Sequence, residues 1–146
     1  MNAVAPPQHA VVIDTNIVLD LLLFADPSTQ ALRAALDTGA LAWLATDAMR
    51  GELQRVLDYP AMRTPLSARG LVATYVLERY DRSAQLRPAA PACGVRCSDP
   101  HDQPFIDLAV AHRARLLSKD KAVLHLRRRL APLAVMVAPG FRPSAA

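Results

Sequence analysis

The sequence has few cysteines and no long apolar segment. Two cysteines among 146 residues are too few for the disulfide framework of a small secreted protein, so a reducing compartment is expected. No apolar run approaches the roughly 20 residues of a membrane-spanning helix. The first ten residues carry no basic cluster of the kind that opens a signal peptide. We therefore expect a cytoplasmic protein without a membrane partner.

The composition indicates one folded domain. Hydrophobic residues make up 52% of the chain, which excludes a disordered protein, and 146 residues suffice for one domain with a sizeable core. A formal net charge of +4 suits a polyanionic partner, although many proteins share so modest an excess. We expect the domain to span residues 10–142, between a loose N-terminal arm at 1–9 and a C-terminal tail at 143–146.

Three β-branched residues, Val11 to Ile13, run directly into Asp14. Because they do not alternate with polar residues, they predict a strand that is buried on both faces. Residues 17–24 are apolar apart from Asp20, which predicts a buried helix. A buried strand that feeds a helix is typical of parallel α/β units, in which ligands bind outside the carboxyl ends of the strands. Asp14 would lie at that edge, either as a helix cap or as part of a site.

The rest of the chain alternates between short apolar runs and stretches with helical spacing. Strands are expected at Leu41–Ala45, Arg115–Ser118 and Leu133–Val137, with a short edge strand somewhere in Arg87–Gly94. Helices are expected from Ser28 or Thr29 to Asp37, from Asp47 to Asp58, from Asp102 to Ala114 and from Lys121 to Leu130. A further helix is expected from Ser67 onward, with Val72, Tyr75, Val76 and Tyr80 on one face. Arg63–Pro65 is expected to be a connection. This alternation predicts a single α/β layer fold.

Four acidic residues are expected at one edge of the sheet. Asp14 and Asp120 directly follow strands, Glu52 lies on the helix after the second strand, and Asp102 begins another helix. In a parallel sheet, strand ends and the starts of the following helices share one edge, so these carboxylates can converge. Hard cations such as Mg²⁺ or Mn²⁺ relieve the repulsion between clustered carboxylates. Such a site suits phosphoryl chemistry, because the metal polarises the phosphate and activates water.

Four motifs together resemble PIN-domain ribonucleases, and most closely the VapC-like branch that supplies the toxins of bacterial toxin–antitoxin pairs. The motifs are Val12–Asn16, Gly51–Leu57, Asp99–Ala109 and Leu116–Leu124, and the resemblance runs from about Val11 to Phe141. It implies one PIN-like α/β domain with a parallel, about five-stranded sheet between helices. It also implies cleavage of RNA that depends on Mg²⁺ or Mn²⁺, and an antitoxin protein as partner.

The resemblance also implies roles for individual residues. By position, the catalytic and metal-binding acids are Asp14, Glu52, Asp102 and Asp120. Asn16 and Ser118 match polar positions of the motifs and are expected to support the site. The chain departs from this branch at His101, where an acid is frequent, and at Lys119, where a small residue is frequent. Neither departure removes one of the four acids.

Other residues have simpler interpretations. Asp99 precedes Pro100, a common turn arrangement, and its contribution to the site stays open. Asp107 lies five residues after Asp102, which on a helix turns it away, so we do not expect it to be a direct ligand. The two cysteines lack a second pair of ligands for zinc and are expected to be free thiols (Cys93, Cys97). Three consecutive arginines are expected to form a solvated helix face (Arg127, Arg128, Arg129).

Three functions compete at this level. The leading hypothesis is a metal-dependent endoribonuclease that hydrolyses phosphodiester bonds with metal-activated water and acts as the toxin of a toxin–antitoxin pair. An alternative is a non-catalytic RNA-binding or regulatory module with the same fold. An aspartyl-phosphate phosphatase is less favoured, because such enzymes carry Asp-x-Asp after the first strand and Asn16 stands at the second position. The expected partners are RNA and a cognate antitoxin, with a second copy of the chain as a further candidate.

Overall fold

The computed structural model describes residues 9–143. The expected arm (1–9) and tail (143–146) lie outside these residues except at His9 and Pro143. The elements in chain order are β1 (Ala10–Ile13), α1 (Thr15–Leu22), α2 (Gln30–Asp37), β2 (Ala42–Ala45), α3 (Asp47–Leu57), α4 (Arg63–Ala68), α5 (Ala73–Ser83), β3 (Ala84–Leu86), α6 (Gln103–His112), β4 (Arg115–Leu117), α7 (Lys121–Leu124), α8 (Arg127–Leu130) and β5 (Val137–Ala138).

The five strands form one parallel sheet in the order β3-β2-β1-β4-β5, which confirms the predicted fold class. From β1 the chain moves outward through β2 to β3, and it then returns to place β4 on the other side of β1. The strand order therefore reverses between β1 and β4. In open parallel sheets, ligand sites form at this reversal, outside the carboxyl ends of the strands.

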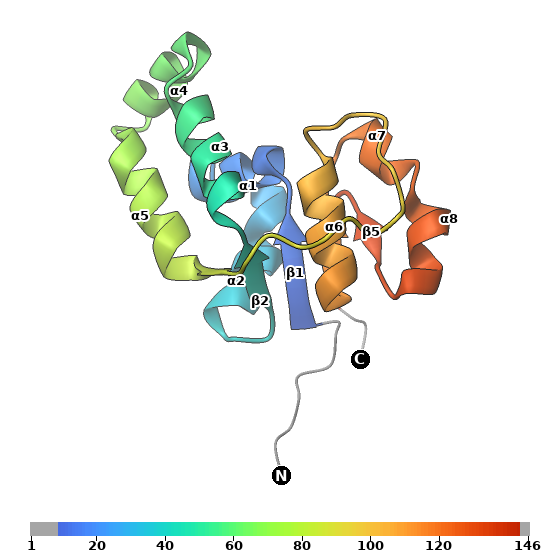
Figure 1. Ribbon diagram of the computed structural model, residues 1–146. Coiled ribbons are helices and arrows are strands. Elements are labelled where there is room, and N and C mark those ends of the chain that lie inside the picture. The colour runs from blue at the N-terminus through green and yellow to red at the C-terminus, as the bar shows by residue number, and fades with distance from the viewer. Residues whose placement is uncertain (1–8, 144–146) are drawn as a thin grey trace.

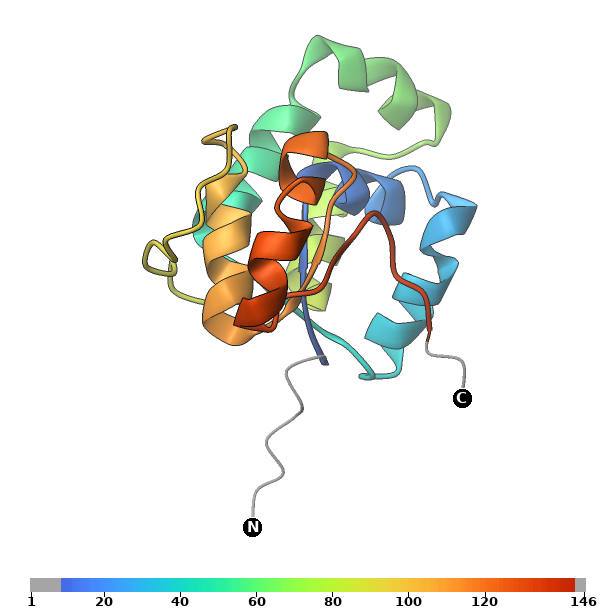
Figure 2. The same cartoon turned by 90° about the vertical axis from the view of Figure 1, so that its right-hand side faces the viewer.

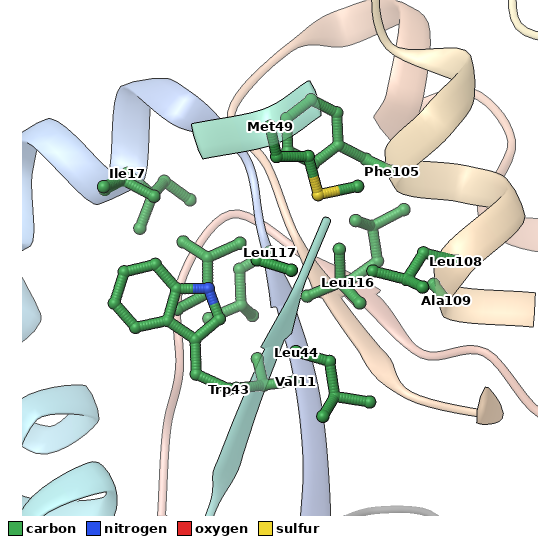
Figure 3. Close-up of a cluster of buried hydrophobic side chains, with 14 of the residues drawn as sticks. Val11, Ile17, Trp43, Leu44, Met49, Phe105, Leu108, Ala109, Leu116 and Leu117 are labelled. Carbon is green, nitrogen blue, oxygen red and sulfur yellow. The ribbon is translucent and has the colours of Figure 1, made fainter. Parts of the chain in front are cut away.

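Helices cover both faces of the sheet. In Figure 1, α6 lies in front of the strands, and Figure 2 places α6 and α2 on opposite sides of β1. Trp43 and Leu44 extend to opposite sides of β2 in the core (Figure 3), and both are buried. Trp43 also meets Tyr80 of α5 edge to face, with 4.8 Å between ring centroids. Burial on both faces explains why the strands are continuously apolar.

Helices α3, α4 and α5 form an arm that extends beyond the sheet (Figure 1). Arg50 of α3 pairs with both carboxylate oxygens of Asp81 of α5, at 2.6 and 2.9 Å, which ties the two helices together. Arg79 of α5 donates to the Leu22 carbonyl at the end of α1, at 3.0 Å. Such donors satisfy carbonyl groups that a helix leaves unpaired at its C-terminus. The contact between Arg79 and Leu22 therefore anchors the arm to the rest of the domain.

The helix expected from Ser67 starts later than predicted. Ser67 belongs to α4, which also replaces the expected connection at Arg63–Pro65. Gly70 has a φ of +64°, a left-handed conformation that breaks the helix before α5 begins at Ala73. Val72, expected on one face of this helix together with Tyr75, Val76 and Tyr80, directly precedes α5. Val72 and Tyr75 are 62% and 41% exposed, whereas the buried residues of α5 are Val76, Leu77 and Tyr80.

Other element boundaries also differ from the predictions. The edge strand lies at Ala84–Leu86, directly after α5 and before the expected range Arg87–Gly94. The helix expected over residues 121–130 is two short helices, α7 and α8, and β5 is limited to Val137–Ala138. Thr29 occupies the N-cap position of α2, as predicted, but its side chain makes no capping hydrogen bond. Asp26 caps the short turn before α2 by accepting the Ser28 backbone N–H. Within residues 9–143, no helix has the length and apolar character needed to cross a bilayer.

Candidate metal centre

The carboxyl ends of β1 and β4 are joined by one buried hydroxyl. The backbone N–H of Asp14 donates to the Leu117 carbonyl at 2.9 Å, which holds the two strand ends together. Ser118, which has no exposed surface, donates its hydroxyl to Asp14 Oδ2 at 2.7 Å. The same hydroxyl oxygen accepts the backbone N–H of Asp120 at 3.1 Å. Ser118 therefore positions two of the predicted acids at once.

Asp120 belongs to a cluster of three carboxylates at this edge of the sheet. One oxygen from each of Asp99, Asp102 and Asp120 lies within 4.8 Å of the others. Asp120 reaches the group from the start of α7, where its Oδ1 accepts the Ala122 N–H at 2.9 Å. Asp99, which the sequence left open, contributes from the turn before α6 and also accepts the His101 N–H at 3.0 Å. The cluster thus combines two acids that were predicted as ligands with one that was undecided.

Asp102 is the buried member of this cluster. It occupies the N-cap position of α6, but its side chain makes no capping hydrogen bond. Its Oδ2 is buried and has no hydrogen-bond partner in the part of the chain described. Burial, the charge of Asp14 and the adjacent Asp120 carboxyl raise the pKa of Asp102 to about 7. A buried carboxylate oxygen without a donor is costly unless a cation meets it.

The other two predicted acids lie at the edge of this cluster. Burial raises the pKa of Asp14, which the Ser118 hydrogen bond lowers in part and the charges of Asp120 and Asp99 raise further. Burial also raises the pKa of Glu52, which is half-buried on α3, and a hydrogen bond with Thr15 opposes that rise. The Asp14 charge adds to the rise at Glu52. Asp14 therefore influences both Glu52 and Asp102, which links all the acids electrostatically.

Not every predicted residue joins the site. Asn16 is exposed on the first turn of α1, and its side chain makes no hydrogen bond within residues 9–143. Asp107 points away from the acids, as predicted, and accepts from the Cys93 backbone N–H at 3.2 Å and from Gln103 Nε2 at 3.0 Å. Thr15, which the sequence analysis did not single out, is buried and holds Glu52. Its position directly after Asp14 was the available signal.

The donor set fits a hard divalent cation. All the clustered ligand atoms are carboxylate oxygens, the type that Mg²⁺ and Mn²⁺ prefer. The unpaired Oδ2 of Asp102 is a buried atom that lacks a positive partner in the described part of the chain. Burial, with a smaller contribution from the charges of neighbouring acids, raises the pKa values of Asp14, Glu52 and Asp102. A cation among these oxygens would remove that repulsion.

A family model described as PIN domain matches residues 10–122. The match extends from the start of β1 into α7 and includes every acid of the cluster. No curated protein matches the chain.

Proposed function

Because the chain belongs to the PIN-domain family, whose members are generally nucleases that use divalent metal, we propose that it is a metal-dependent endoribonuclease. The observation that carries the proposal is the buried, unpaired Oδ2 of Asp102 within a cluster of carboxylates at the strand-order reversal. We assign Asp14, Glu52, Asp102 and Asp120 to metal binding, with Asp99 as a further ligand candidate. The proposed cofactor is Mg²⁺ or Mn²⁺.

The chain's own residues would hold and orient the reacting groups. Ser118 keeps Asp14 in a fixed rotamer by donating to Oδ2, and the Ala122 N–H does the same for Asp120 through Oδ1. The Thr15 side chain forms a hydrogen bond with Glu52 that lowers the pKa of Glu52. A divalent cation bound there would polarise the phosphodiester and favour in-line attack by water. Fixing the ligands beforehand lowers the entropic cost of binding, as expected for supporting hydrogen bonds around metal sites.

The test is cleavage of mixed RNAs with Mg²⁺ or Mn²⁺, followed by the same reaction in chelator. We expect cleavage only with metal, and products that end in 5′-phosphate and 3′-hydroxyl groups, because water attacks phosphorus and the 3′-oxygen departs. Cleavage that persists in chelator would contradict the mechanism. Products with 2′,3′-cyclic phosphates would do so too, since they require attack by the 2′-hydroxyl of the RNA.

We also propose that the chain is the toxin of a toxin–antitoxin pair. This proposal rests on the motif resemblance and on the partly exposed carboxylates of Asp99 and Asp120, with which an arginine of an antitoxin can pair. Expression of the chain alone should slow growth of its host, and Asp14→Asn should relieve the effect. If the wild-type chain is harmless when it is expressed alone, the toxin role is excluded while the nuclease proposal stands.

The same assays separate the competing functions. A non-catalytic RNA-binding module would bind RNA and leave it intact in Mg²⁺ and in Mn²⁺. An aspartyl-phosphate phosphatase would release phosphate from small esters and form a covalent intermediate on Asp14. The exposed Asn16 supplies no second carboxylate at the position where such a phosphatase carries one. Among residues 9–143, no contact favours either alternative over the nuclease.

A further inference from the structure

A cavity of about 290 Å³ opens beside the acidic cluster. It lies between α3 and the turn that leads into α6, and Glu52 forms part of its wall. His101, another wall residue, donates its backbone N–H to Asp99 of the cluster. The residues that follow Asp99 in the turn therefore line the cavity, while Asp99 and Asp102 face the cluster. A group bound in the cavity would therefore lie directly next to a cation or phosphate bound at the acidic cluster.

The cavity is built from surfaces that suit a flat ring. Its apolar wall includes Met49 and Phe105, which are 5% and 3% exposed and lie side by side in Figure 3. Its rim carries a phenol, an imidazole and a guanidinium, from Tyr59, His101 and Arg55. Tyr59 is 54% exposed although it is a large aromatic side chain. Unpaired RNA bases are bound by stacking on Tyr, His and Arg planes, and this cavity has all three.

The size and place of the cavity limit its occupant. Its volume is near the lower end of ligand pockets, about 300 Å³, which suits one base rather than a larger group. A paired base is held inside its helix and cannot fill a cavity, so the base must be unpaired. We propose that this cavity binds the unpaired nucleobase of the nucleotide adjacent to the phosphate at the acidic cluster. This inference rests on the proposed function, and it makes single-stranded RNA or loops the substrate class.

The test is nucleotide binding to the full chain carrying ¹³C-labelled methionine methyl groups, in Mg²⁺. Met49 lies in the cavity wall, and Met136, which is 57% exposed outside this cavity, is an internal control. We expect at least one of the four nucleoside 5′-monophosphates to shift the Met49 signal saturably and to leave Met136 unchanged. Ribose 5-phosphate, which has the phosphate and no base, should leave Met49 unchanged.

Substitutions at the rim give a quantitative check. Tyr59→Ala should raise the nucleotide dissociation constant by roughly 5- to 150-fold, the range expected when one stacking partner is lost. Tyr59→Phe should retain the affinity, because the ring remains. The matched control is Tyr75→Ala, which removes an aromatic ring that is 41% exposed and lies outside the cavity. This variant should bind like wild type.

The outcomes distinguish this inference from the nuclease proposal, because mononucleotides have no bond to cleave. If Met49 responds to nucleotides in a protein that fails to cut RNA, the base site stands and the nuclease proposal fails. If the protein cuts RNA but Met49 ignores all four nucleotides, or responds equally to ribose 5-phosphate, the base site is wrong. A response to arginine amide alone would also overturn the inference and assign the cavity to a protein side chain.

Discussion

Ser118 donates a hydrogen bond of 2.7 Å to Asp14, although 104 positions separate the two residues in the chain. The bond joins the ends of β1 and β4, where the strand order reverses. Ser118 contacts a second acid as well, because the same hydroxyl oxygen accepts the Asp120 N–H. The acids of the candidate centre are therefore positioned by a side chain that is not itself acidic.

Ser118→Ala should destabilise the metal-free protein by about 1–3 kcal/mol, because it leaves buried groups of Asp14 and Asp120 without a partner. It should also raise the pKa of Asp14, which the Ser118 hydrogen bond lowers. Urea unfolding in chelator measures the first effect. An unfolding midpoint equal to that of wild type would show that the Ser118 hydroxyl is not needed at this site.

Asp14→Asn and Asp120→Asn should each unfold at a higher temperature than wild type in chelator at neutral pH. Each change keeps the shape of the side chain and removes one repelling charge from the cluster. Mg²⁺ should raise the wild-type midpoint by mass action, since it binds the folded site, and should raise the midpoints of the two variants much less. Thermal melts with Mg²⁺ and with chelator measure both effects.

Glu78→Gln is a suitable control for these melts, because Glu78 is an exposed residue in the middle of α5. Asp107→Asn is a poorer control, since Asp107 accepts two hydrogen bonds around α6. Glu78→Gln should melt like wild type and keep the response to Mg²⁺. Destabilisation of both Asp variants in chelator, together with equal metal responses in all four proteins, would refute a common site.

The metal-free protein should become less stable as the pH rises from 5 to 8. The pKa of Asp102 is raised to about 7, so the folded state binds more protons than the unfolded state between pH 3.8 and about 7. The free energy of unfolding therefore falls with rising pH in this window and levels off above it. The raised pKa values of Asp14 and Glu52 act with the same sign.

Asp102→Asn tests the origin of this pH dependence. Urea unfolding in chelator at several pH values should give a flatter profile for the variant than for wild type, because the variant cannot titrate at this position. Acids whose pKa is lowered, such as Asp81 beside Arg50, are ionised throughout this pH range and contribute nothing. Parallel profiles for variant and wild type would assign the effect to other groups.

Thr15→Val should weaken the response to metal without altering the fold. The substitution keeps the size of the side chain and removes the hydroxyl that restrains Glu52. Loss of such a supporting hydrogen bond commonly costs 10- to 100-fold in metal affinity, so we expect the half-saturating Mg²⁺ concentration to rise by roughly that factor. A Mg²⁺ titration followed by thermal shift measures it. Thr64→Val, at an exposed position of α4, should have no effect.

Two valines four residues apart test the corrected position of α5. Val76→Ala should cost about 2 kcal/mol, because Val76 has no exposed surface and the change removes buried methyl groups and leaves a cavity. Val72→Ala should change stability by less than about 0.5 kcal/mol, since Val72 is 62% exposed. Denaturant unfolding of both variants measures this difference between two residues that the sequence placed on one helix face.

The central strands could be predicted because their pattern reflects burial alone. Val11 to Ile13 and Leu116 to Leu117 are continuously apolar since both faces of the sheet are covered. The candidate centre followed from the same reasoning, because parallel strands bring their carboxyl ends to one edge. The arm that includes α4 and α5 lacks such a constraint. Helical spacing predicted one helix from Ser67 that included Val72, whereas the positive φ of Gly70 separates Ser67 from α5, which begins at Ala73.

The details of the centre depended on tertiary contacts that no local pattern contains. Asp102 stood where a helix cap is common, yet its carboxylate turns into the cluster and caps nothing. Asp99 looked like a turn residue and lies within the cluster as well. Thr15 and Ser118 gain their importance from partners in other elements, Glu52 on α3 and Asp14 after β1. Only the folded chain brings these partners together.

The order of the strands has a consequence during protein synthesis. The ribosome releases β1 with Asp14 among the first elements and Asp120 after β4, so the centre cannot assemble until most of the chain has emerged. Chains that stop before β4 lack the Ser118 hydroxyl that orients Asp14, and they lack Asp120 altogether. If the chain cleaves RNA, unfinished copies on the ribosome are harmless to the messenger that encodes them. The activity then begins only after β4 and Asp120 have been synthesised and have folded onto β1.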